Sequence, residues 1–548
     1  MESITVTLFL LLAVVVSGWL QRGLPWSLPL PIVQIALGAL IALVAKAPVE
    51  LDPDVFFLLF LPPLLFLDGW RIPKEGLFRD KDTILELAVG LVIFTVVGLG
   101  FLINWMIPAM PLPVAFALAA VVSPTDPVAV SALSSRAPIP KRLLHILEGE
   151  SLLNDASGLV CMRFAVAAAM TGMFSPLAAV GTFLWLSLGG IVIGVVFTWV
   201  ITRLKDWMTW RLGEDSGSQI LISLLIPFGA YLMAEHLHCS GILAAVAAGI
   251  TMSYAELTGR ALATTRMRRS GVWDTIQFSV NGVVFVLLGE QMPKLIEGAA
   301  RVVQDAGHHD PLWLIGYVIA INAALAALRF IWVWVSLRLT LFRASRAGQG
   351  TPVRRPSLRL VAATSLAGVR GAITLAGVLT LPLFLPDGSP FPARDLAIFL
   401  AAGVILTSLV AATVGLPFVL RGLQIPAEPA HDEQEDSARI AAAEAAIKAI
   451  EHAQHELSKN RADADLYADT GAKIMDVYRA RITSQPRSVE EAQKMRLMGE
   501  IERQLRLAGL RAERDELYRL VRARQLSEEL VRKLVREIDL LEARLISI

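Results

Sequence analysis

Much of the chain up to residue 421 consists of apolar stretches whose length matches the thickness of a lipid bilayer. A hydrocarbon core of about 30 Å requires about 20 apolar residues in a helix, which satisfies every backbone N–H and C=O within the segment. Thirteen stretches meet this requirement, in a chain that is 55% hydrophobic. We therefore predict an all-α polytopic membrane protein with 13 transmembrane helices. The predicted spans are residues 3–20, 26–45, 52–69, 83–107, 112–133, 143–171, 177–202, 217–237, 241–257, 272–291, 311–341, 358–382 and 394–421.

The charged loops predict how these spans are oriented. Lys and Arg gather in alternate loops, for example at 71–81, 203–211 and 260–269, whereas the intervening loops hold few of them. Because cytoplasmic loops carry the excess of basic residues, we expect the N-terminus outside and the C-terminal part in the cytoplasm. This arrangement needs an odd number of spans. The expected location is a plasma membrane, such as the inner membrane of a bacterium.

The composition changes after residue 422. Residues 423–436 contain two prolines and the polar run HDEQED, which predicts a linker after the transmembrane domain of residues 1–422. Residues 437–548 are charged, with apolar residues at helical spacing. We expect them to form a cytoplasmic helical domain that self-associates as a dimer or binds a regulatory partner.

Composition also limits the ligands and partners. The net charge is +1, and the basic residues of the C-terminal part are interleaved with acidic ones, which argues against a nucleic-acid partner. The chain has two cysteines and no metal-ligand spacing. We therefore expect no cofactor, and membrane lipid as the surroundings of residues 1–422.

Polar residues inside the apolar spans are the strongest functional signal, because a charge at the bilayer centre costs at least about 2.5–3.5 kcal/mol. The first group lies in VVSPTDPVAV, residues 121–130. Pro124 and Pro127 each lack an N–H and should open the helix around Thr125 and Asp126. The exposed carbonyl and hydroxyl oxygens suit a hard cation such as Na⁺. The alternative is a proline kink in which Asp126 binds the freed backbone.

The second group lies in EGESLLNDASGLV, residues 148–160. Ser151, Asn154 and Asp155 occupy positions i, i+3 and i+4, so they share one face of a helix. That face offers a hydroxyl, an amide oxygen and a carboxylate. The alternative, a polar cluster that joins helices, explains the serine and the asparagine better than the aspartate.

The third group is SLAGVRGAITLAG, residues 365–377, in which Arg370 lies between Gly368 and Gly371. Glycines weaken a helix, and a guanidinium can satisfy loose carbonyls and a carboxylate together. We expect Arg370 to be structural and to balance Glu150 or Asp126. The alternative is an arginine that reaches the membrane interface.

One interrupted span in each half of the chain is typical of transporters built from inverted repeats. Spans 1–6 and 8–13 would form the two repeats, with span 7 as the connector. Span 5 then corresponds to span 12, and these are the two interrupted spans. We therefore expect two broken helices that cross near the middle of the membrane.

Three segments in this order, SPTDPVAV, GESLLNDASGLV and GVRGAITLAG, resemble the signature of monovalent cation:proton antiporters. The branch is that of the bacterial NhaP proteins and the eukaryotic sodium/proton exchangers. LPPLLFLDGW, residues 61–70, is similar to the third-span motif of that branch. The resemblance covers about residues 1–422.

The resemblance implies a site and an architecture. Na⁺ would be held at Asp155, Ser151 and Thr125, and Glu150 would form a buried ion pair with Arg370. Spans 4–6 and 11–13 would form a moving core, and spans 1–3 and 8–10 would form the scaffold of a homodimer. The complete set of implied ion-binding residues is Asp155, Asn154, Ser151, Asp126, Thr125 and Asp68, the last of which either lines the cytoplasmic funnel or joins the site.

These residues suggest a mechanism. Burial disfavours the charged form of Asp155, so H⁺ and Na⁺ should compete for one carboxylate, and the core should cross only when that carboxylate is neutralised. We expect a secondary active transporter that exchanges Na⁺ or Li⁺ for H⁺ by alternating access and serves pH homeostasis. One carboxylate, with asparagine at position 154 where electrogenic members of the wider superfamily have aspartate, implies 1:1 electroneutral exchange.

The same residues suggest three other functions. K⁺ in place of Na⁺ stays open, because ligand types do not fix the size of the cavity. A cation channel would use the same oxygens but would need no carboxylate that takes up a proton. An intramembrane aspartyl protease would use Asp126 and Asp155, but it would not explain Asn154 or Arg370. We therefore expect no enzyme activity.

Overall fold

A computed structural model of the chain shows a helical protein made of two compact units, Met1–Ile425 and Pro426–Ile548. All regular elements in the described part are helices, and an isolated antiparallel bridge joins Phe384 to Pro390. The described residues are 2–23, 28–45, 53–72, 74–126, 141–172, 176–256, 262–305, 312–346, 358–421, 429–459, 464–483, 489–523, 525–526 and 528–546.

Each of the thirteen predicted spans overlaps at least one helix of the first unit. The helices of its first half are α1 (Glu2–Gly23), α2 (Leu30–Ala45), α3 (Pro53–Arg71), α4 (Lys74–Arg79), α5 (Lys81–Leu85), the π-helix η1 (Glu86–Leu91), α6 (Val92–Met106), α7 (Leu112–Val122) and α9 (Lys141–Thr171). Those of its second half are α10 (Pro176–Leu212), α11 (Ser216–His236), α12 (Gly241–Glu256), α13 (Ala263–Asp305), α14 (Leu312–Arg346), α15 (Leu358–Leu366), α16 (Ala372–Leu379) and α17 (Arg394–Leu420).

The helices are apolar enough to support a polytopic membrane protein. In the described part, 7 helical stretches are long and apolar enough to cross a bilayer, and four shorter helices are also apolar. The exact number of crossings stays a prediction, because several spans are short or interrupted.

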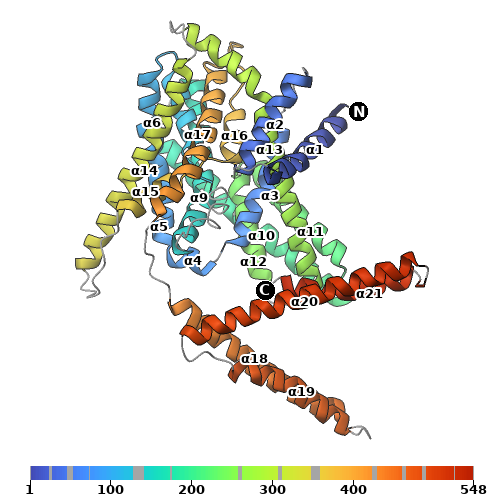
Figure 1. Cartoon of the computed structure of the whole chain (residues 1–548). Coiled ribbons are helices and arrows are strands. Elements are labelled where there is room, and N and C mark those ends of the chain that lie inside the picture. Colours follow the sequence, from blue (N-terminus) through green and yellow to red (C-terminus); the bar gives the residue numbers. More distant parts are fainter. Residues whose placement is uncertain are drawn as a thin grey trace. The chain divides into compact units, whose positions relative to one another are not determined.

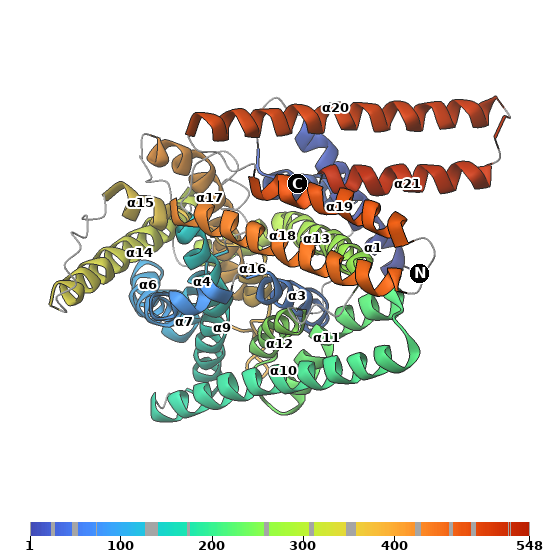
Figure 2. The same cartoon turned by 90° about the horizontal axis from the view of Figure 1, so that it is seen from below.

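The helices of the first unit pack as two bundles, which lie side by side in Figures 1 and 2. In the first bundle, α2 packs along α13, α3 packs along α12, and α1, α10 and α11 join them. In the second bundle, α4, α5, η1, α6, α7 and α9 pack with one another and with α14–α17. Contacts of α13 with α17 and of α3 with α16 connect the two bundles.

Small residues allow the close packing of the first bundle. A Cβ at Gly38 of α2 would collide with the carbonyl of Val286, and a Cβ at Gly289 of α13 would collide with the carbonyl of Ile35. Gly249 of α12 lies in the same way against the backbone of α3. Because lipid gives no hydrophobic drive between helices, such close backbone contacts supply much of the packing energy.

The second bundle contains the two interrupted helices. Helix α7 ends at Val122, and residues 123–126 are not helical. Residues 367–371 separate α15 from α16. Predicted span 12 is therefore broken as expected. Span 5 is broken after Val122, and Pro127, the second proline of its motif, lies outside the described residues.

The second unit consists of two helical hairpins. Helix α18 (Pro429–Ser458) packs on α19 (Ala464–Thr483), and α20 (Val489–Arg522) packs on α21 (Glu528–Ile546). Helix α18 begins inside the stretch 423–436 that was expected to be a linker. Proline is tolerated at the first position of a helix, where no backbone N–H is needed. Residues 423–428 of that stretch lie outside the described part.

Candidate functional site

The two interruptions meet each other. The backbone N–H of Asp126, just after α7, donates to the carbonyl of Val369, between α15 and α16, at 2.7 Å. Helix α7 cannot continue normally past this point, because Pro124 has no N–H for the carbonyl of Ala120. The two interruptions therefore meet at this hydrogen bond, and we call this meeting point the crossing. That two complete broken helices cross here stays a prediction, because residues 127–140 lie outside the described part.

Two glycines allow this close contact. A Cβ at Gly371 would collide with the carboxylate of Asp126, so a larger residue between α16 and the opened end of α7 would have to displace that side chain. A Cβ at Gly158 of α9 would meet Cγ of Pro124 at 2.4 Å and the carbonyl oxygen of Ala120 at 2.7 Å. Helix α9, which carries the second polar group, therefore lies directly against the interruption of α7.

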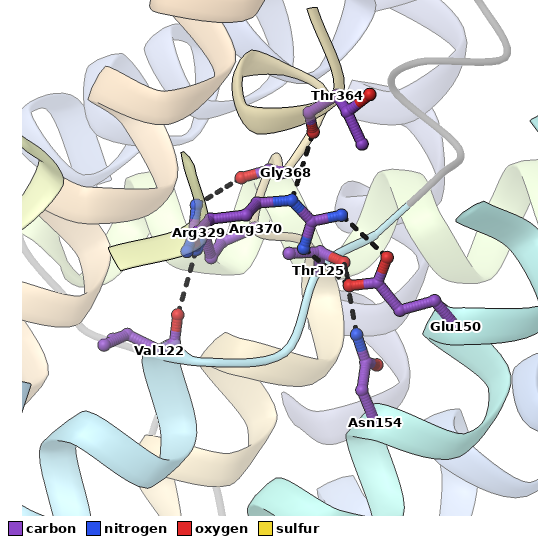
Figure 3. A network of polar contacts seen from close by, with 8 residues as sticks. All are labelled: Val122, Thr125, Glu150, Asn154, Arg329, Thr364, Gly368 and Arg370. Carbon is purple, nitrogen blue, oxygen red and sulfur yellow. Dashed lines mark hydrogen bonds and ion pairs between the residues drawn. The ribbon is translucent and has the colours of Figure 1, made fainter. Parts of the chain in front are cut away.

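Arg370 stabilises the crossing by binding backbone carbonyls. Its Nε donates to the carbonyl of Val122 at 2.9 Å, and one terminal nitrogen donates to the carbonyl of Gly368. Figure 3 shows this side chain reaching from its own interruption to the last residue of α7. The guanidinium thus satisfies C=O groups that the broken helices leave without partners, at a helix end where positive charge is favoured.

Glu150 has a different partner from the one expected. Its two carboxylate oxygens accept from Arg329 of α14, at 2.5 Å and 2.7 Å, and Nε of Arg329 donates to the carbonyl of Thr364 at 3.1 Å. The predicted Glu150–Arg370 ion pair is corrected to Glu150–Arg329, since Arg370 is bound to carbonyls. Arg329 was missed, although an arginine inside the apolar span 311–341 is the same signal that singled out Arg370.

A chain of hydrogen bonds leads from this ion pair to the second polar group. Thr125 donates its hydroxyl to Oε1 of Glu150 at 3.4 Å, and the amide nitrogen of Asn154 donates to the hydroxyl oxygen of Thr125 at 3.1 Å. Figure 3 shows Thr125 between Glu150 and Asn154. The amide oxygen of Asn154 is buried and has no hydrogen-bond partner among the described residues. An acceptor of this kind is free to bind a cation.

Asp155 follows Asn154 on α9 and is also buried, with 6% of its surface exposed. Within the described part of the chain, its carboxylate has no hydrogen bond or ion pair. Asp126 and Asp68 lie within electrostatic range of it. Asp68, near the end of α3, and Asp126 are half-buried. Ser151 is buried one turn before Asp155 on the same helix. The residues predicted for the site are thus gathered around the crossing.

The site offers oxygen atoms rather than a transition-metal cluster. No three His, Cys, Asp or Glu side chains of the described residues converge closely enough to hold a metal ion. The hydroxyl of Ser123 is another buried oxygen without a hydrogen-bond partner in the described structure. Ser123 was not among the predicted site residues. Its position next to Pro124, in the opened end of α7, is the signal that would have identified it.

The sequence matches a protein family and several relatives. A family model described as "sodium/hydrogen exchanger, transmembrane" matches residues 7–422. An uncharacterized Na⁺/H⁺ exchanger of Escherichia coli K12, YjcE, is 42% identical over 553 residues, which cover all of this chain and 99% of the relative. A sodium, potassium, lithium and rubidium/H⁺ antiporter of Bacillus pumilus is 39% identical over 534 residues, which cover 96% of this chain and 76% of the relative.

The fold was compared with solved structures. The sodium proton antiporter MjNhaP1 of Methanocaldococcus jannaschii matches with a TM-score of 0.59 at 18% sequence identity, covering 77% of this chain and 99% of that one. At this identity the match supports the fold alone. The family model and the relatives confirm the resemblance that the three motifs carry, and they agree with a multi-pass membrane protein. The chain therefore belongs to the sodium/hydrogen exchanger family, whose members are transporters and not enzymes.

Proposed function

We propose that the protein exchanges Na⁺ or Li⁺ for H⁺ at Asp155. The observation that carries this proposal is a buried carboxylate without a partner in the described structure, next to the unpartnered amide oxygen of Asn154. A buried charge that nothing balances is costly. A carboxylate in this position is therefore stable when it carries either a proton or a cation, which is the property an exchanger needs.

The proposed cation ligands are oxygen atoms, as hard cations prefer. Na⁺ would bind the carboxylate of Asp155 and the hydroxyls of Ser151 and Thr125. The amide oxygen of Asn154 would support it. Asp126 joins the two interruptions through its backbone N–H, and its carboxylate, within electrostatic range of Asp155, would support the bound cation. Asp68 would line the entrance to the site, in agreement with its partial exposure.

The proposed transport cycle is alternating access with one exchanged ion for each proton. The second bundle would be the moving core, because it holds both interruptions and the network from Arg329 to Asn154. The first bundle would be the scaffold, because its α2–α13 and α3–α12 pairs are packed backbone against backbone. Crossing with either Na⁺ or H⁺ on Asp155 moves the same net charge in each direction, so exchange is electroneutral.

A proteoliposome experiment tests this function. The lumen is acidified, a pH-sensitive dye reports lumenal H⁺, and NaCl is added outside. Wild-type protein should release H⁺, and Asp155→Asn should reduce the release to the level of protein-free liposomes. Asp395→Asn makes the same chemical change at an exposed carboxylate at the start of α17, and it should leave exchange within about twofold of wild type. Full activity of Asp155→Asn in a folded protein would refute the proposal.

K⁺ is the alternative ion, and one observation favours it. Relatives from Bacillus pumilus and Bacillus subtilis, each 39% identical, are described as antiporters of sodium, potassium, lithium and rubidium. The same dye experiment with Na⁺, Li⁺ and K⁺ in turn decides between a sodium-selective and a broad antiporter. Repeating it with a potential-sensitive dye tests electroneutrality. A cation channel would instead pass current and would not couple the ion to H⁺.

We also propose the setting of the transporter. Thirteen crossings, arranged as two inverted repeats, would put the N-terminus and the second unit on opposite sides of the membrane. The basic residues of the loops would then place the N-terminus outside and the second unit in the cytoplasm. The protein would work as a homodimer in a bacterial inner membrane and would serve pH homeostasis. The second unit would self-associate or bind a regulatory partner.

A further inference from the structure

A second polar site lies in the first bundle, apart from the crossing. A pocket of ≈ 510 Å³ opens where the end of α10, the start of α11, the end of α12 and the start of α13 come together. Three basic side chains line it: Arg203 and Lys205 from α10 and Arg269 from α13. The pocket is at the end of the bundle where the sequence concentrates Lys and Arg.

Arg269 is buried in the wall of this pocket, with its guanidinium over the ring of Trp70. Only 1% of its surface is exposed, and it pairs with Glu256. Its Nε and one terminal nitrogen have no hydrogen-bond partner among the described residues. Arg329 in the other bundle, by contrast, uses Nε and both terminal nitrogens. Buried donors almost always have a hydrogen-bond acceptor. We therefore expect Arg269 to bind an acceptor that is not among the described residues.

The other groups of the pocket indicate what this acceptor is. The acid Glu256 is already engaged, since it accepts from the indole N–H of Trp70 at 2.8 Å and pairs with Arg269. Asp206 lies 3.7 Å from the ammonium of Lys205. Gln219 donates its amide nitrogen to Thr209, and its amide oxygen is buried without a partner. The pocket therefore holds three basic and two acidic side chains, which leaves it a net positive charge, and the amide oxygen of Gln219 adds an acceptor. This combination suits an anion that also carries a hydroxyl group.

The flank of the pocket is suited to lipid. Trp207 and Trp210 line it and are 51% and 81% exposed. The preceding turns of α10 expose Val200 and Leu204. Tryptophan is enriched at the membrane–water interface, and basic pockets between transmembrane helices bind the headgroups of anionic lipids. A phospholipid whose phosphate group binds at Arg269 would therefore have its acyl chains next to the apolar side of α10.

We propose that this pocket binds the phosphate group of an anionic phospholipid. Arg269 and Arg203 donate to the phosphate oxygens, Lys205 adds positive charge, and Gln219 accepts from a headgroup hydroxyl such as those of phosphatidylglycerol. The site is separate from the ion-binding crossing, so it is tested by binding and not by transport.

Native mass spectrometry of the full-length protein in detergent tests the proposal. The protein is titrated with phosphatidylglycerol or with phosphatidylcholine of the same acyl chains. Phosphatidylglycerol should be retained preferentially. The variant Arg203→Gln/Lys205→Gln keeps the Arg269–Glu256 pair, so it is expected to fold, and it should bind phosphatidylglycerol about tenfold more weakly. Arg268→Gln removes an exposed charge next to Arg269 that does not line the pocket, and it should bind within about twofold of wild type.

Further results distinguish a lipid headgroup from free phosphate as the ligand and test whether it binds in this pocket. Inorganic phosphate that competes with phosphatidylglycerol supports recognition of the phosphate group. Binding of inorganic phosphate without retention of phosphatidylglycerol overturns the lipid as its source. Equal retention of both lipids, or equal weakening by Arg268→Gln and by the double variant, overturns the proposal as a whole.

Discussion

At the scale of single residues, the best-defined interaction is the buried Glu150–Arg329 pair. Side-chain exposure is 1% for Glu150 and 4% for Arg329, and the contact is bidentate. Removing one partner of a buried pair leaves an uncompensated charge, which costs about 3–5 kcal/mol. We therefore predict that Arg329→Gln strongly lowers the Tm of the purified protein, measured by the loss of the monodisperse species on heating.

Two controls accompany this prediction. Arg338→Gln removes an exposed arginine of the same helix, which lies over the ring of Trp334, and it should change the Tm little. Glu150→Gln/Arg329→Gln should recover part of the loss, because no charge is then left unpaired. A double variant as unstable as the sum of the two single variants would contradict the pair.

The site residues were largely predictable from the sequence, but their pairing was not. Asp155, Asn154 and Thr125 were found because polar groups are costly in apolar spans. The same cost applies to Arg329, so its importance could also have been predicted from the sequence. Its partner could not be predicted, because Glu150 lies 179 residues away and two intramembrane arginines compete for that carboxylate. Only packing decides which arginine binds a carboxylate and which binds carbonyls.

At the scale of elements, the proposed transport depends on the crossing of the two interruptions. A methyl group at position 371 would occupy the space of the Asp126 carboxylate. We predict that Gly371→Ala displaces the opened end of α7 and lowers exchange in proteoliposomes at least about tenfold, since a shift of about 1 Å at a binding site can cost a hundredfold.

The matched control for this change is Gly316→Ala in α14. No heavy atom lies within 4 Å of a Cβ built at Gly316, and alanine is a better helix former than glycine. Exchange by Gly316→Ala should therefore equal that of wild type. If Gly371→Ala also retains wild-type exchange, the close contact at the crossing is not required for transport.

The N-terminus of helix α11 lies just before the predicted span 217–237, and its capping interaction provides a pH-dependent test. Its N-cap residue, Asp215, accepts from the hydroxyl of Ser218 and from the backbone N–H groups of Ser218 and Gly217. These hydrogen bonds, those of Ser218 first, lower the pKa of Asp215 below its ordinary value of 3.8. A pKa lowered in the folded state stabilises the protein above the ordinary value, and this contribution disappears as the pH falls through the lowered pKa.

We predict that Asp215→Ala lowers the Tm at neutral pH and that the difference from wild type shrinks as the pH falls below 3.8. Asp215→Asn retains a capping side chain without a titrating group. Its difference from wild type should therefore be small at neutral pH. An Asp215→Ala difference that grows on acidification would contradict the cap.

The positions of the helices were predictable because hydropathy and proline are local signals. Each apolar span contains a helix, and the interruptions lie at Pro124 and between Gly368 and Gly371, where the sequence predicted them. The helix ends were less predictable. Helix α13 runs from Ala263 to Asp305, well beyond the predicted span 272–291, because a helix can continue into water after its apolar part ends. The contact of Asp126 with Val369 depends on tertiary packing.

At the scale of the whole molecule, thirteen crossings predict that the N-terminus and the start of the second unit lie on opposite sides of the membrane. Single cysteines at Ser3 and Ser437 in a protein without Cys161 and Cys239 test this with a membrane-impermeant thiol reagent in intact cells. Cysteine at position 3 should react at once, and cysteine at position 437 only after permeabilisation. Reaction of both from the same side would mean an even number of crossings.

If Na⁺ and H⁺ compete for the carboxylate of Asp155, the apparent KM for Na⁺ must depend on pH. Initial rates of Na⁺ uptake into proteoliposomes are measured over a range of Na⁺ concentrations at several pH values on the side of Na⁺ entry. Competition predicts that the KM for Na⁺ rises as the pH falls, approaching about tenfold per pH unit for one proton per site, while the maximal rate is unchanged. A KM that does not depend on pH, with a maximal rate that falls on acidification, would contradict a shared site.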